Sequence, residues 1–467
     1  MEKNKLDKKS KPVRKKTLTV VYKESIFVNM RYHVAYQLLM LLGTVIGCLV
    51  LGCSNSEGVN NEVVAFWDIE EDGASFSAKI DYLPLDDSEY PYAGIPRIVI
   101  ETENHREIKD RETEIPAKLQ IWGEHAPESE IMDLTIRGRG NTSWGMPKKS
   151  YKIEFINKQS MLGMPKDRDW ALIANYADKT LMKNYLMYHL SAKLGAYYAP
   201  RCEFVEFYLN NEYLGVYLLT ETIKKTKKRV NISDSNSYIV EVDAKYRDDE
   251  QVVFSKVIKQ NSLGKAFRIH YPKKASETAL HDIETHIQSF ETFLKDSIKT
   301  SSNLSQWIDV NEYVKHYWVQ EFSKNPDACF NSSIFFSWTK DNIIKMGPVW
   351  DFDLAMGNYD NKSISSPQDW HIKESYWNDF IFRDSIAAQA KIDFWTENKL
   401  AFKELLNAID SIQVALNKAA KNNFKKWIIL QNTSFIYHPA SYKSYQNATE
   451  DLKKWIIERY SWIDSQL

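Results

Sequence analysis

Apolar and polar side chains alternate with the two-residue period of β-strands in the first half of the chain, from about residue 95. This alternation predicts strands at residues 97–101, 117–122, 132–137, 149–155 and 170–174. Apolar side chains then recur at helical spacing over residues 179–194, and residues 204–209 and 215–219 predict a hairpin that turns at Asn210 and Asn211. The first half is therefore predicted to be mainly β, with one prominent helix.

The second half has the 3.6-residue periodicity of amphipathic helices. The helical stretches are residues 281–299, 309–323, 383–424 and 446–466, and one apolar strand is expected at residues 334–338. The polar segment between them, residues 234–274, contains short strand-like runs and reads as an insertion or a junction. The pattern thus predicts an α+β protein with a β-rich lobe at about 95–230, a mainly helical lobe at about 275–467, and a ligand cleft between the lobes.

The segment before this region has the layout of a secretory signal. Residues 34–52 contain no charged side chain, follow a basic flank, and end in Leu51, Gly52 and Cys53. A cysteine directly after Leu and Gly resembles a bacterial lipobox, in which Cys53 becomes the lipidated first residue of the mature protein. We therefore expect a signal peptide at residues 30–53, a spacer at residues 54–94, and a membrane-anchored lipoprotein on the outer side of the membrane.

Other interpretations of the N-terminal segment stay open. The apolar run approaches the ~20 residues that span a bilayer, so it is also compatible with an uncleaved membrane anchor. Cys48, which follows Gly47, is a second candidate for lipidation. Met30 and Arg31 would begin a signal peptide of ordinary length, so residues 1–29 are either an untranslated upstream extension or a basic cytoplasmic one.

Charge and cysteine content exclude several classes of protein. Residues 1–29 hold nine Lys/Arg and three Asp/Glu, whereas the part after Cys53 holds 51 basic and 59 acidic residues, a net charge of -8. This acidic balance argues against nonspecific nucleic-acid binding, which needs a basic surface. After Cys53 only Cys202 and Cys329 remain, which supports neither a disulfide framework nor a thiolate metal site.

Two glycines and several cations cluster early in the β-rich region. Residues 137–144 read Arg-Gly-Arg-Gly-Asn-Thr-Ser-Trp, and Lys148, Lys149 and Lys152 follow. Glycines between strands let the backbone turn tightly and direct N–H groups at an anion, while nearby cations supply charge. Such a segment is also common as a solvated turn. Its place early in the β-rich lobe favours a loop that binds polyphosphate.

Two carboxylates flank a phenylalanine in the helical region. The segment is Gly-Pro-Val-Trp-Asp-Phe-Asp, residues 347–353, with apolar neighbours. Carboxylates in such surroundings are costly to bury unless they bind a cation or several donors. Mg²⁺ held by Asp351 and Asp353 together with substrate phosphates meets that demand. The alternative is a turn in which Asp351 caps a helix.

A third polar cluster follows a predicted amphipathic helix. It reads Asn-Pro-Asp at residues 325–327 and continues to Asn331 and Ser332 before an apolar strand. A kinase catalytic loop places a carboxylate beside the acceptor hydroxyl and, shortly afterwards, a polar side chain on the metal. Asp327 and Asn331 have the residue types for these roles. A plain Asn-Pro-Asp turn is the alternative.

Taken together, these motifs resemble the spore coat protein H (CotH) kinase family in order and spacing. Further matching segments are Lys-Lys-Ser-Tyr-Lys at 148–152, Trp-Ala-Leu-Ile-Ala-Asn at 170–175, Asn-Glu-Tyr-Leu-Gly-Val-Tyr-Leu-Leu-Thr-Glu at 211–221, and the two acidic motifs. The resemblance covers roughly residues 95–465. It implies an atypical protein-kinase-like fold of two lobes and ATP-dependent phosphorylation of secreted or surface proteins.

The resemblance also implies roles for individual residues. The glycine-bearing segment would contact ATP phosphates, and Lys149 or Lys152 would assist. Asp327 would orient or deprotonate the acceptor hydroxyl, and Asp351 with Asp353 would hold Mg²⁺ or Mn²⁺. Glu221 would lie near the hinge behind the adenine. The predicted cofactor-binding residues are therefore Arg137, Gly138, Arg139, Gly140, Lys149, Lys152 and Glu221, and the predicted metal ligands are Asp351, Asp353 and Asn331.

Some positions depart from the usual kinase pattern. No His-Arg pair precedes Asp327, and Ser332 stands five residues after it, where a kinase has Asn. The metal motif reads Asp-Phe-Asp rather than Asp-Phe-Gly, and no single lysine is clearly the strand lysine. These departures leave the second metal ligand and the lysine assignment open.

Two functions of different classes are compatible with the sequence. One is a kinase that transfers the γ-phosphoryl group of ATP to Ser or Thr of an exported protein. The other is a surface-anchored pseudokinase that binds a protein or glycan, which the 14 Trp and 26 Tyr residues support. A hydrolase is disfavoured, because the chain has neither a nucleophile elbow nor a His-Glu-x-x-His zinc motif.

Overall fold

A computed structural model describes residues 82–467 except 234, 248, 260–263, 297–302, 435, 436 and 438. The elements below all belong to the unit formed by residues 78–467. The predicted signal peptide, Cys53 and most of the predicted spacer lie outside the described residues. Among the helices that are described, none is long and apolar enough to cross a membrane.

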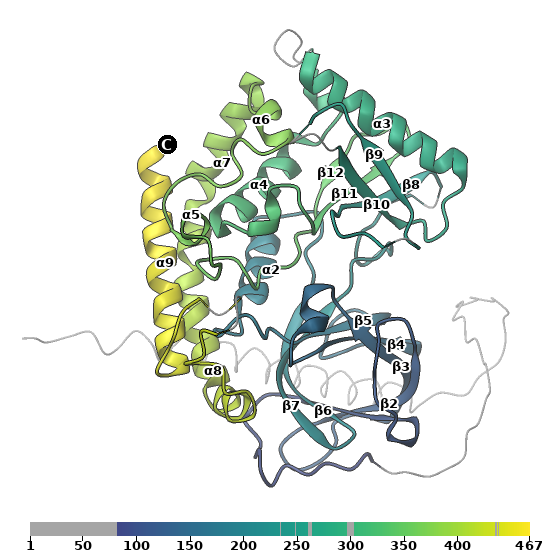
Figure 1. The fold of residues 1–467 in the computed structure, drawn as a ribbon, viewed down its shortest axis with the longest axis vertical. Coiled ribbons are helices and arrows are strands. Elements are labelled where there is room, and N and C mark those ends of the chain that lie inside the picture. The colour runs from purple at the N-terminus through teal and green to yellow at the C-terminus, as the bar shows by residue number, and fades with distance from the viewer. Residues whose placement is uncertain are drawn as a thin grey trace, which may run out of the picture. The chain divides into compact units, whose positions relative to one another are not determined.

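Seven strands of the N-terminal region close into a barrel, in the order β1-β2-β3-β4-β5-β7-β6 (Figure 1). The barrel closes where β6 pairs in parallel with β1, with Arg97 opposite Glu206, and every other pair is antiparallel. The strands are β1 Arg97–Thr102, β2 Ile115–Trp122, β3 Met132–Arg139, β4 Ser150–Gln159, β5 Asp167–Ile173, β6 Cys202–Leu209 and β7 Glu212–Glu221.

The predicted alternation places one side of each strand inside the barrel. Ile98, Leu119, Ile136 and Ile153 are fully buried in the barrel core, and the residues that alternate with them point to the other side of the sheet. The predicted hairpin is confirmed, since β6 and β7 pair across Asn210 and Asn211. Both asparagines have positive φ angles, 50° and 61°, which suit the tight turn of a two-residue hairpin.

A second, five-stranded sheet lies next to the barrel, in the order β12-β11-β8-β10-β9. Its strands are β8 Ser237–Val242, β9 Val252–Ser255, β10 Lys265–Tyr271, β11 Ile334–Thr339 and β12 Lys345–Met346. Strand β11 confirms the apolar strand expected at 334–338. The segment 234–274, interpreted from sequence as an insertion or junction with short strands, supplies three strands of this sheet, among them β8 where a strand was expected.

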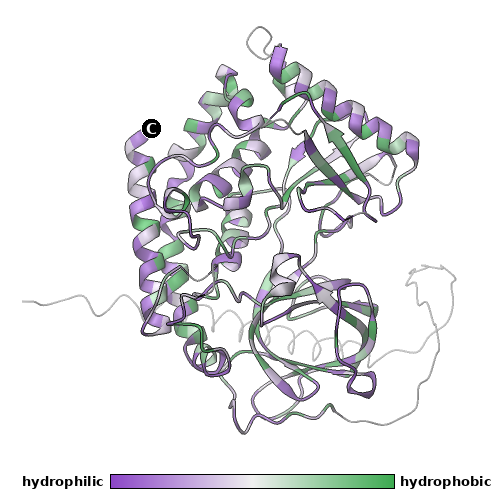
Figure 2. Cartoon of the chain, in the orientation of Figure 1, coloured by the Kyte–Doolittle hydropathy of each residue, from purple (hydrophilic) through white to green (hydrophobic). Residues whose placement is uncertain are grey.

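The C-terminal part is mainly helical, as predicted. Helix α2, Lys183–Lys193, crosses from the barrel region into it, and the remaining helices are α3 Glu277–Asp296, α4 Val310–Ser323, α5 Lys362–Ser365, α6 Trp377–Ile381, α7 Ser385–Lys403, α8 Leu405–Lys426 and α9 Tyr445–Gln466. The single helix expected at 383–424 is two helices that meet at Glu404. Figure 2 shows hydrophobic and hydrophilic bands alternating along α3 and α9, as amphipathic helices require.

Helix α8 joins the helical part to the barrel. Asn423 Oδ1 accepts hydrogen bonds from Lys148 Nζ at 2.9 Å and from the Val216 N–H at 3.0 Å, and both donors belong to the barrel region. Directly after α8, the indole N–H of Trp427 donates to the Leu214 carbonyl at 2.9 Å. The fold is thus a mixed α/β structure with a β-rich N-terminal region and a helical C-terminal part.

Candidate active site

A cavity of about 740 Å³ is lined by residues of the barrel, of the second sheet and of the loops beside α4. It brings together residues that are more than three hundred positions apart in the sequence, from Arg111 to Tyr437. Seven of the predicted site residues line it: Arg137, Arg139, Gly140, Lys152, Asp327, Asp351 and Asp353. The basic, glycine-bearing segment and both acidic motifs therefore share one cavity.

The glycine-bearing segment needs its glycines for local structural reasons. Gly140 has a φ of 99°, and a Cβ atom there would lie 2.0 Å from Ser143 Oγ. Gly138 donates its N–H to the Asp110 carbonyl at 3.0 Å, and a Cβ there would lie 2.5 Å from the Trp144 ring. Gly140 therefore makes the turn that lines the cavity, whereas Gly138 packs behind it.

The cations predicted for this segment differ in how strongly they are already bound. The Arg139 guanidinium lies over the Trp350 ring, 4.8 Å from its centroid, beside the acidic pair. Arg137 Nη1 donates to the Arg111 carbonyl at 2.5 Å. Lys152 Nζ forms ion pairs with Asp169 at 2.8 Å and with Glu154 at 2.9 Å. Of these three, Arg139 is the cation placed nearest to the two aspartates.

The Asp-Phe-Asp segment is held by α2 and by the loop after α4. Phe352 is fully buried, and its N–H donates to Asn184 Oδ1 of α2 at 2.7 Å. The Asp351 carbonyl accepts from Asn325 Nδ2 at 3.1 Å, which ties this segment to the Asn-Pro-Asp loop. Asp351 itself has a φ of 66°, an unusual conformation for a residue other than glycine. These contacts explain why the two acidic motifs lie together.

Asp351 and Asp353 interact directly with one another. Burial raises the pKa of Asp353 well above its usual range, and the adjacent Asp351 carboxylate raises it further. Burial also raises the pKa of Asp351, while the hydrogen bond from Asp353 and the Arg139 charge oppose that rise. Asp351 lines the cavity and is exposed to it. The pair therefore favours retaining a proton unless a cation is bound.

Asp327 lies in the short 3₁₀ turn Pro326–Ala328, which Asn325 caps through its side chain. Burial raises the pKa of Asp327 to about 6, and the Asp351 charge adds to the rise. Lys245 and a hydrogen bond from Ser332 act in the opposite direction. At neutral pH Asp327 is thus mostly ionised, with a proton affinity suited to a general base.

Four predicted site residues do not line the cavity. Gly138 lies behind the turn, and Lys149 Nζ donates to the Trp144 carbonyl at 2.5 Å. Asn331 is exposed, and its carbonyl accepts from the Ala244 N–H at 2.8 Å. Its neighbour Ser332 lines the cavity and donates a hydrogen bond to Asp327. Ser332 thus holds the position five residues after Asp327 where kinases have Asn.

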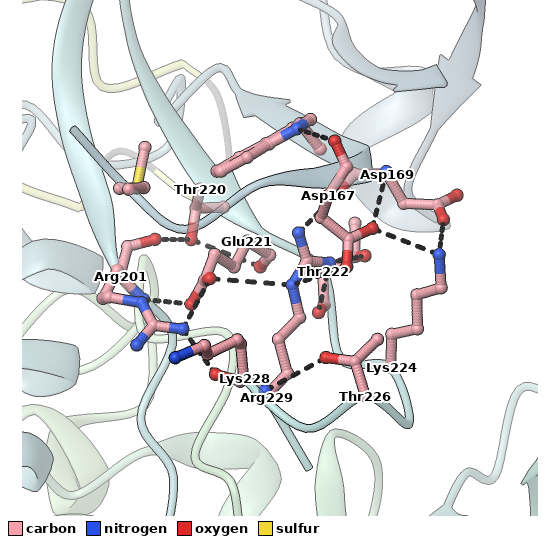
Figure 3. A network of polar contacts seen from close by, with 12 residues as sticks. Asp167, Asp169, Arg201, Thr220, Glu221, Thr222, Lys224, Thr226, Lys228 and Arg229 are labelled. Carbon is pink, nitrogen blue, oxygen red and sulfur yellow. Dashed lines mark hydrogen bonds and ion pairs between the residues drawn. The ribbon is translucent and has the colours of Figure 1, made fainter. Parts of the chain in front are cut away.

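Glu221, the fourth, lies at the end of β7 in a buried polar network (Figure 3). It is fully buried and accepts from Arg201 Nη2 at 2.7 Å and from the Tyr198 hydroxyl at 3.2 Å. Arg229 Nε lies 3.6 Å from both Glu221 Oε1 and Asp167 Oδ2. Glu221 therefore stabilises the junction between the barrel and the second sheet, and the residues directly after it line the cavity.

The family model of the CotH kinase protein matches residues 136–463, which is more than half of the chain. The chain belongs to the CotH kinase family. A comparison with curated proteins found no match. Membership indicates a kinase-like phosphotransferase and, in general terms, the use of ATP and a divalent metal ion.

The cavity of this CotH kinase family member has an apolar part as well as a charged part. Ile173 of β5 and Ile223 after β7 line one side, and Ile239, Tyr271 and Phe335 of the second sheet line another. Apolar side chains from both the barrel region and the second sheet suit a flat aromatic group. The sequence alone did not predict this part, because its members come from five separate segments.

Sequence analysis also missed the charged residues of the second sheet. Glu241 lies between apolar neighbours in β8 and is nearly fully buried, and it pairs with Arg268 and with His270 Nε2, the latter at 2.6 Å. Asp243 and Lys245 follow it and line the cavity. A charged residue within the otherwise apolar run Tyr238–Val242 was the available signal.

Asp351 and Asp353 suit a divalent ion whose other ligands are water and nucleotide phosphates. Within residues 82–467, apart from the undescribed positions, no group of three or more His, Cys, Asp or Glu could hold a metal. Mg²⁺ commonly takes one or two carboxylates and completes its octahedron with water and nucleotide phosphates. Asp351 and Asp353, which are hydrogen-bonded to each other and have raised pKa values, provide that kind of incomplete site.

Proposed function

We propose that this CotH kinase family member is an ATP-dependent protein kinase with a protein-kinase-like arrangement of two lobes. In this proposal it transfers the γ-phosphoryl group of ATP to Ser or Thr of exported or surface proteins, and a lipid on Cys53 tethers it to the membrane. One observation carries the proposal: Arg139 and Gly140 share a single cavity with Asp327, Asp351 and Asp353.

The proposed nucleotide position follows from the two parts of the cavity. The base would lie beside Ile173 and Phe335, where apolar side chains of the barrel and of the second sheet line the cavity. The polyphosphate would extend toward Gly140 and Arg139, because backbone N–H groups and a cation stabilise anionic oxygens. The barrel and the helical part would then act as the two lobes on either side of ATP.

Asp327 is the proposed base for the acceptor hydroxyl. In the transfer, the acceptor oxygen forms a bond to the γ-phosphorus, the bond from that phosphorus to the β–γ bridging oxygen breaks, and ADP leaves. The hydroxyl proton passes to Asp327, whose pKa of about 6 allows it to be ionised before the reaction and to accept a proton during it. Ser332 would orient the Asp327 carboxylate through its hydrogen bond.

Asp351 and Asp353 are the residues that would hold Mg²⁺ or Mn²⁺. The ion supplies positive charge that neutralises the phosphate oxygens during transfer. Both carboxylates would be ionised when the ion binds, because its positive charge offsets the repulsion between their two negative charges. The contacts of Asn184 and Asn325 with this segment would keep it in position.

The alternative function, a surface-binding pseudokinase, has less support from the described residues. Most of the large aromatic side chains are inside: Trp170, Trp318, Trp377 and Trp395 are fully buried. In the described part of the chain, the exposed large aromatics are Tyr82, Tyr246 and Phe254. Aromatic content therefore reflects the core more than a binding surface for glycans or proteins.

Nucleotide binding tests the proposal directly. The full chain should melt several degrees higher with ATP plus Mg²⁺ or Mn²⁺ than with either alone, because a ligand that binds only the folded state stabilises it. Gly140→Ala should reduce this rise, because its Cβ would lie 2.0 Å from Ser143 Oγ. Gly145→Ala is the matched control, since nothing lies within 4 Å of a Cβ there. If the melting temperature of the wild type does not rise with ATP and either metal, the surface-binding pseudokinase is favoured.

Phosphoryl transfer tests the metal assignment. Asp351→Asn should lower transfer to a protein substrate by at least about a hundredfold, because it removes a negative charge from the metal site. Its circular dichroism and its melting temperature without ligand should match those of the wild type or exceed them. Transfer at the wild-type rate by this variant would refute the role of Asp351.

A further inference from the structure

Lys245 lines the cavity but belongs to none of the motifs found in the sequence. It follows β8 in the second sheet, its side chain is exposed to the cavity, and its Nζ lies 3.5 Å from Thr142 Oγ1. Thr142 belongs to the glycine-bearing segment of the barrel, two residues after Gly140. Lys245 therefore extends from the second sheet toward the proposed phosphate site.

The backbone around Lys245 is fixed on the acidic side of the cavity. The Lys245 N–H donates to Asp243 Oδ1 at 2.8 Å, and the Ala244 N–H donates to the Asn331 carbonyl at 2.8 Å. Asn331 lies next to Ser332 in the segment that begins at Asp327. Lys245 thus begins beside the proposed catalytic loop and reaches the glycine-bearing segment opposite.

The charge of Lys245 acts on both acidic motifs. It lowers the pKa of Asp327 and of Asp351, against the larger effect of burial, which raises both. Lys245 interacts with both carboxylates and also reaches Thr142. It therefore lies between the proposed base, the proposed metal ligand and the proposed phosphate loop. A transferring phosphoryl group would have to pass through this region of the cavity.

Lys245 is also less engaged than several other cations of the cavity. Lys152 and Lys224 pair with Asp169, Arg268 pairs with Glu241 and Glu250, and Arg247 pairs with Glu112. Within the described part of the chain, Lys245 has no carboxylate at ion-pair distance. An exposed ammonium group without a carboxylate partner is available to a phosphate oxygen.

We infer that Lys245 binds the γ-phosphate of ATP and stabilises the charge on the phosphoryl group as it moves to the acceptor. This inference rests on the proposed function and adds a residue to it. Arg139 from the barrel and Lys245 from the second sheet would contact the polyphosphate from two sides, whereas Lys152 would be held by its carboxylates.

The test compares ATP with ADP, since the two differ by the γ-phosphate. Titration calorimetry of the full chain with Mn²⁺ should show that Lys245→Ala weakens ATP binding about tenfold, while ADP binding changes less than about twofold. Lys245→Arg should restore most of the preference for ATP, because it restores the positive charge. The turnover number for transfer should fall more steeply in Lys245→Ala than ATP affinity does, because the phosphoryl charge is redistributed in the transition state.

Lys274→Ala is the matched control, because Lys274 is exposed, lies in the connection between β10 and α3 and does not line the cavity. A Lys245→Ala variant that keeps the wild-type ratio of ATP to ADP affinity and the wild-type turnover overturns the inference while the proposed function stands. Equal losses of ATP and ADP affinity also overturn it, since they indicate a structural role. A wild type that binds neither nucleotide overturns the proposed function and this inference with it.

Discussion

At the scale of single residues, Asp327 is placed where its charge is useful for chemistry and unfavourable for folding. Burial and the Asp351 charge raise its pKa from 3.8 to about 6 in the folded state. A carboxyl whose folded pKa exceeds its unfolded pKa destabilises the fold as pH rises from about 4 to 6, and the cost remains at higher pH. Two pKa units correspond to about 3 kcal/mol, or about 2 kcal/mol after allowance for partial exposure.

Replacing this carboxyl should therefore stabilise the protein while abolishing the proposed chemistry. Asp327→Asn should increase the free energy of unfolding by about 2 kcal/mol at pH 7.5 in the absence of nucleotide and metal, and the gain should vanish near pH 4. Urea unfolding at the two pH values measures this difference. Asp360→Asn, at an exposed position, is the control. A variant that is less stable than the wild type at pH 7.5 would contradict the account of Asp327.

The residue types of the site could be predicted from sequence, but not every position. Arg139, Gly140, Asp327, Asp351 and Asp353 line one cavity as the motifs indicated. Asn331 was predicted where Ser332 lines the cavity, because positive φ angles at Phe330 (57°) and Ser333 (58°) redirect the loop. Such conformations are rare for these residue types and could not be predicted from the sequence, although the spacing from Asp327 already pointed to Ser332 as the residue at the usual kinase position. Lys245 was missed because it belongs to no motif.

At the scale of secondary-structure elements, the polar network at the end of β7 determines how the barrel continues into the second sheet. Arg229 is buried, lies over the Trp170 ring, and donates to the Asp169 carbonyl at 2.8 Å and to the Thr222 carbonyl at 3.0 Å. It also lies near the carboxylates of Asp167 and Glu221. Its loss would leave buried carboxylates with fewer partners, which is strongly destabilising.

Arg229→Met should accordingly lower the free energy of unfolding by about 3 kcal/mol, since it removes the charge but keeps much of the volume. Guanidinium chloride unfolding of both proteins gives the difference. The neighbouring Lys228→Ala is the control, because Lys228 contacts this network through its backbone carbonyl, which accepts from Arg201 Nη2 at 2.6 Å. A loss below about 1 kcal/mol would mean that the network contributes little to this junction.

Sequence patterns identified the long elements more reliably than the short ones. The strands β1 to β7 and the helices α3, α4 and α9 lie close to their predicted positions, because their hydrophobic periodicity extends over several residues. Strands β9 and β10 were not predicted individually, and the sheet that they form with β8 was not predicted either, because it is completed by β11, which pairs with β8 about ninety residues away. Local patterns contain no information about such pairing.

At the scale of the whole molecule, the closure of the barrel and the position of α8 could not be predicted either. Parallel pairing of β1 with β6 joins strands about a hundred residues apart, and the contact of Lys148 with Asn423 joins residues 275 positions apart. These long-range contacts bring the glycine-bearing segment to the acidic motifs. The resemblance to a kinase family predicted that the glycine-bearing segment and the acidic motifs lie together, whereas hydrophobic periodicity alone did not.

Attachment to the membrane is a prediction about the chain as a whole, since Cys53 lies outside the described residues. Cys53→Ala should prevent lipidation and release the protein into the soluble fraction of the cell envelope or mislocalise it. Fractionation of cells that express each form, with metabolic labelling by a fatty acid, measures this. Cys48→Ala should remain labelled and membrane-bound. Retention of the unlabelled Cys53→Ala variant in the membrane would support an uncleaved anchor instead.

The central claim is that Asp351 and Asp353 hold a divalent ion against the phosphates of ATP in one cavity. Anomalous diffraction at the manganese edge, from crystals grown with Mn²⁺ and a nonhydrolysable ATP analogue, tests it most directly. The account predicts a manganese peak at the Asp351 and Asp353 carboxylates, with the triphosphate between them and Gly140. Nucleotide density outside this cavity, or manganese that contacts neither aspartate, would contradict it.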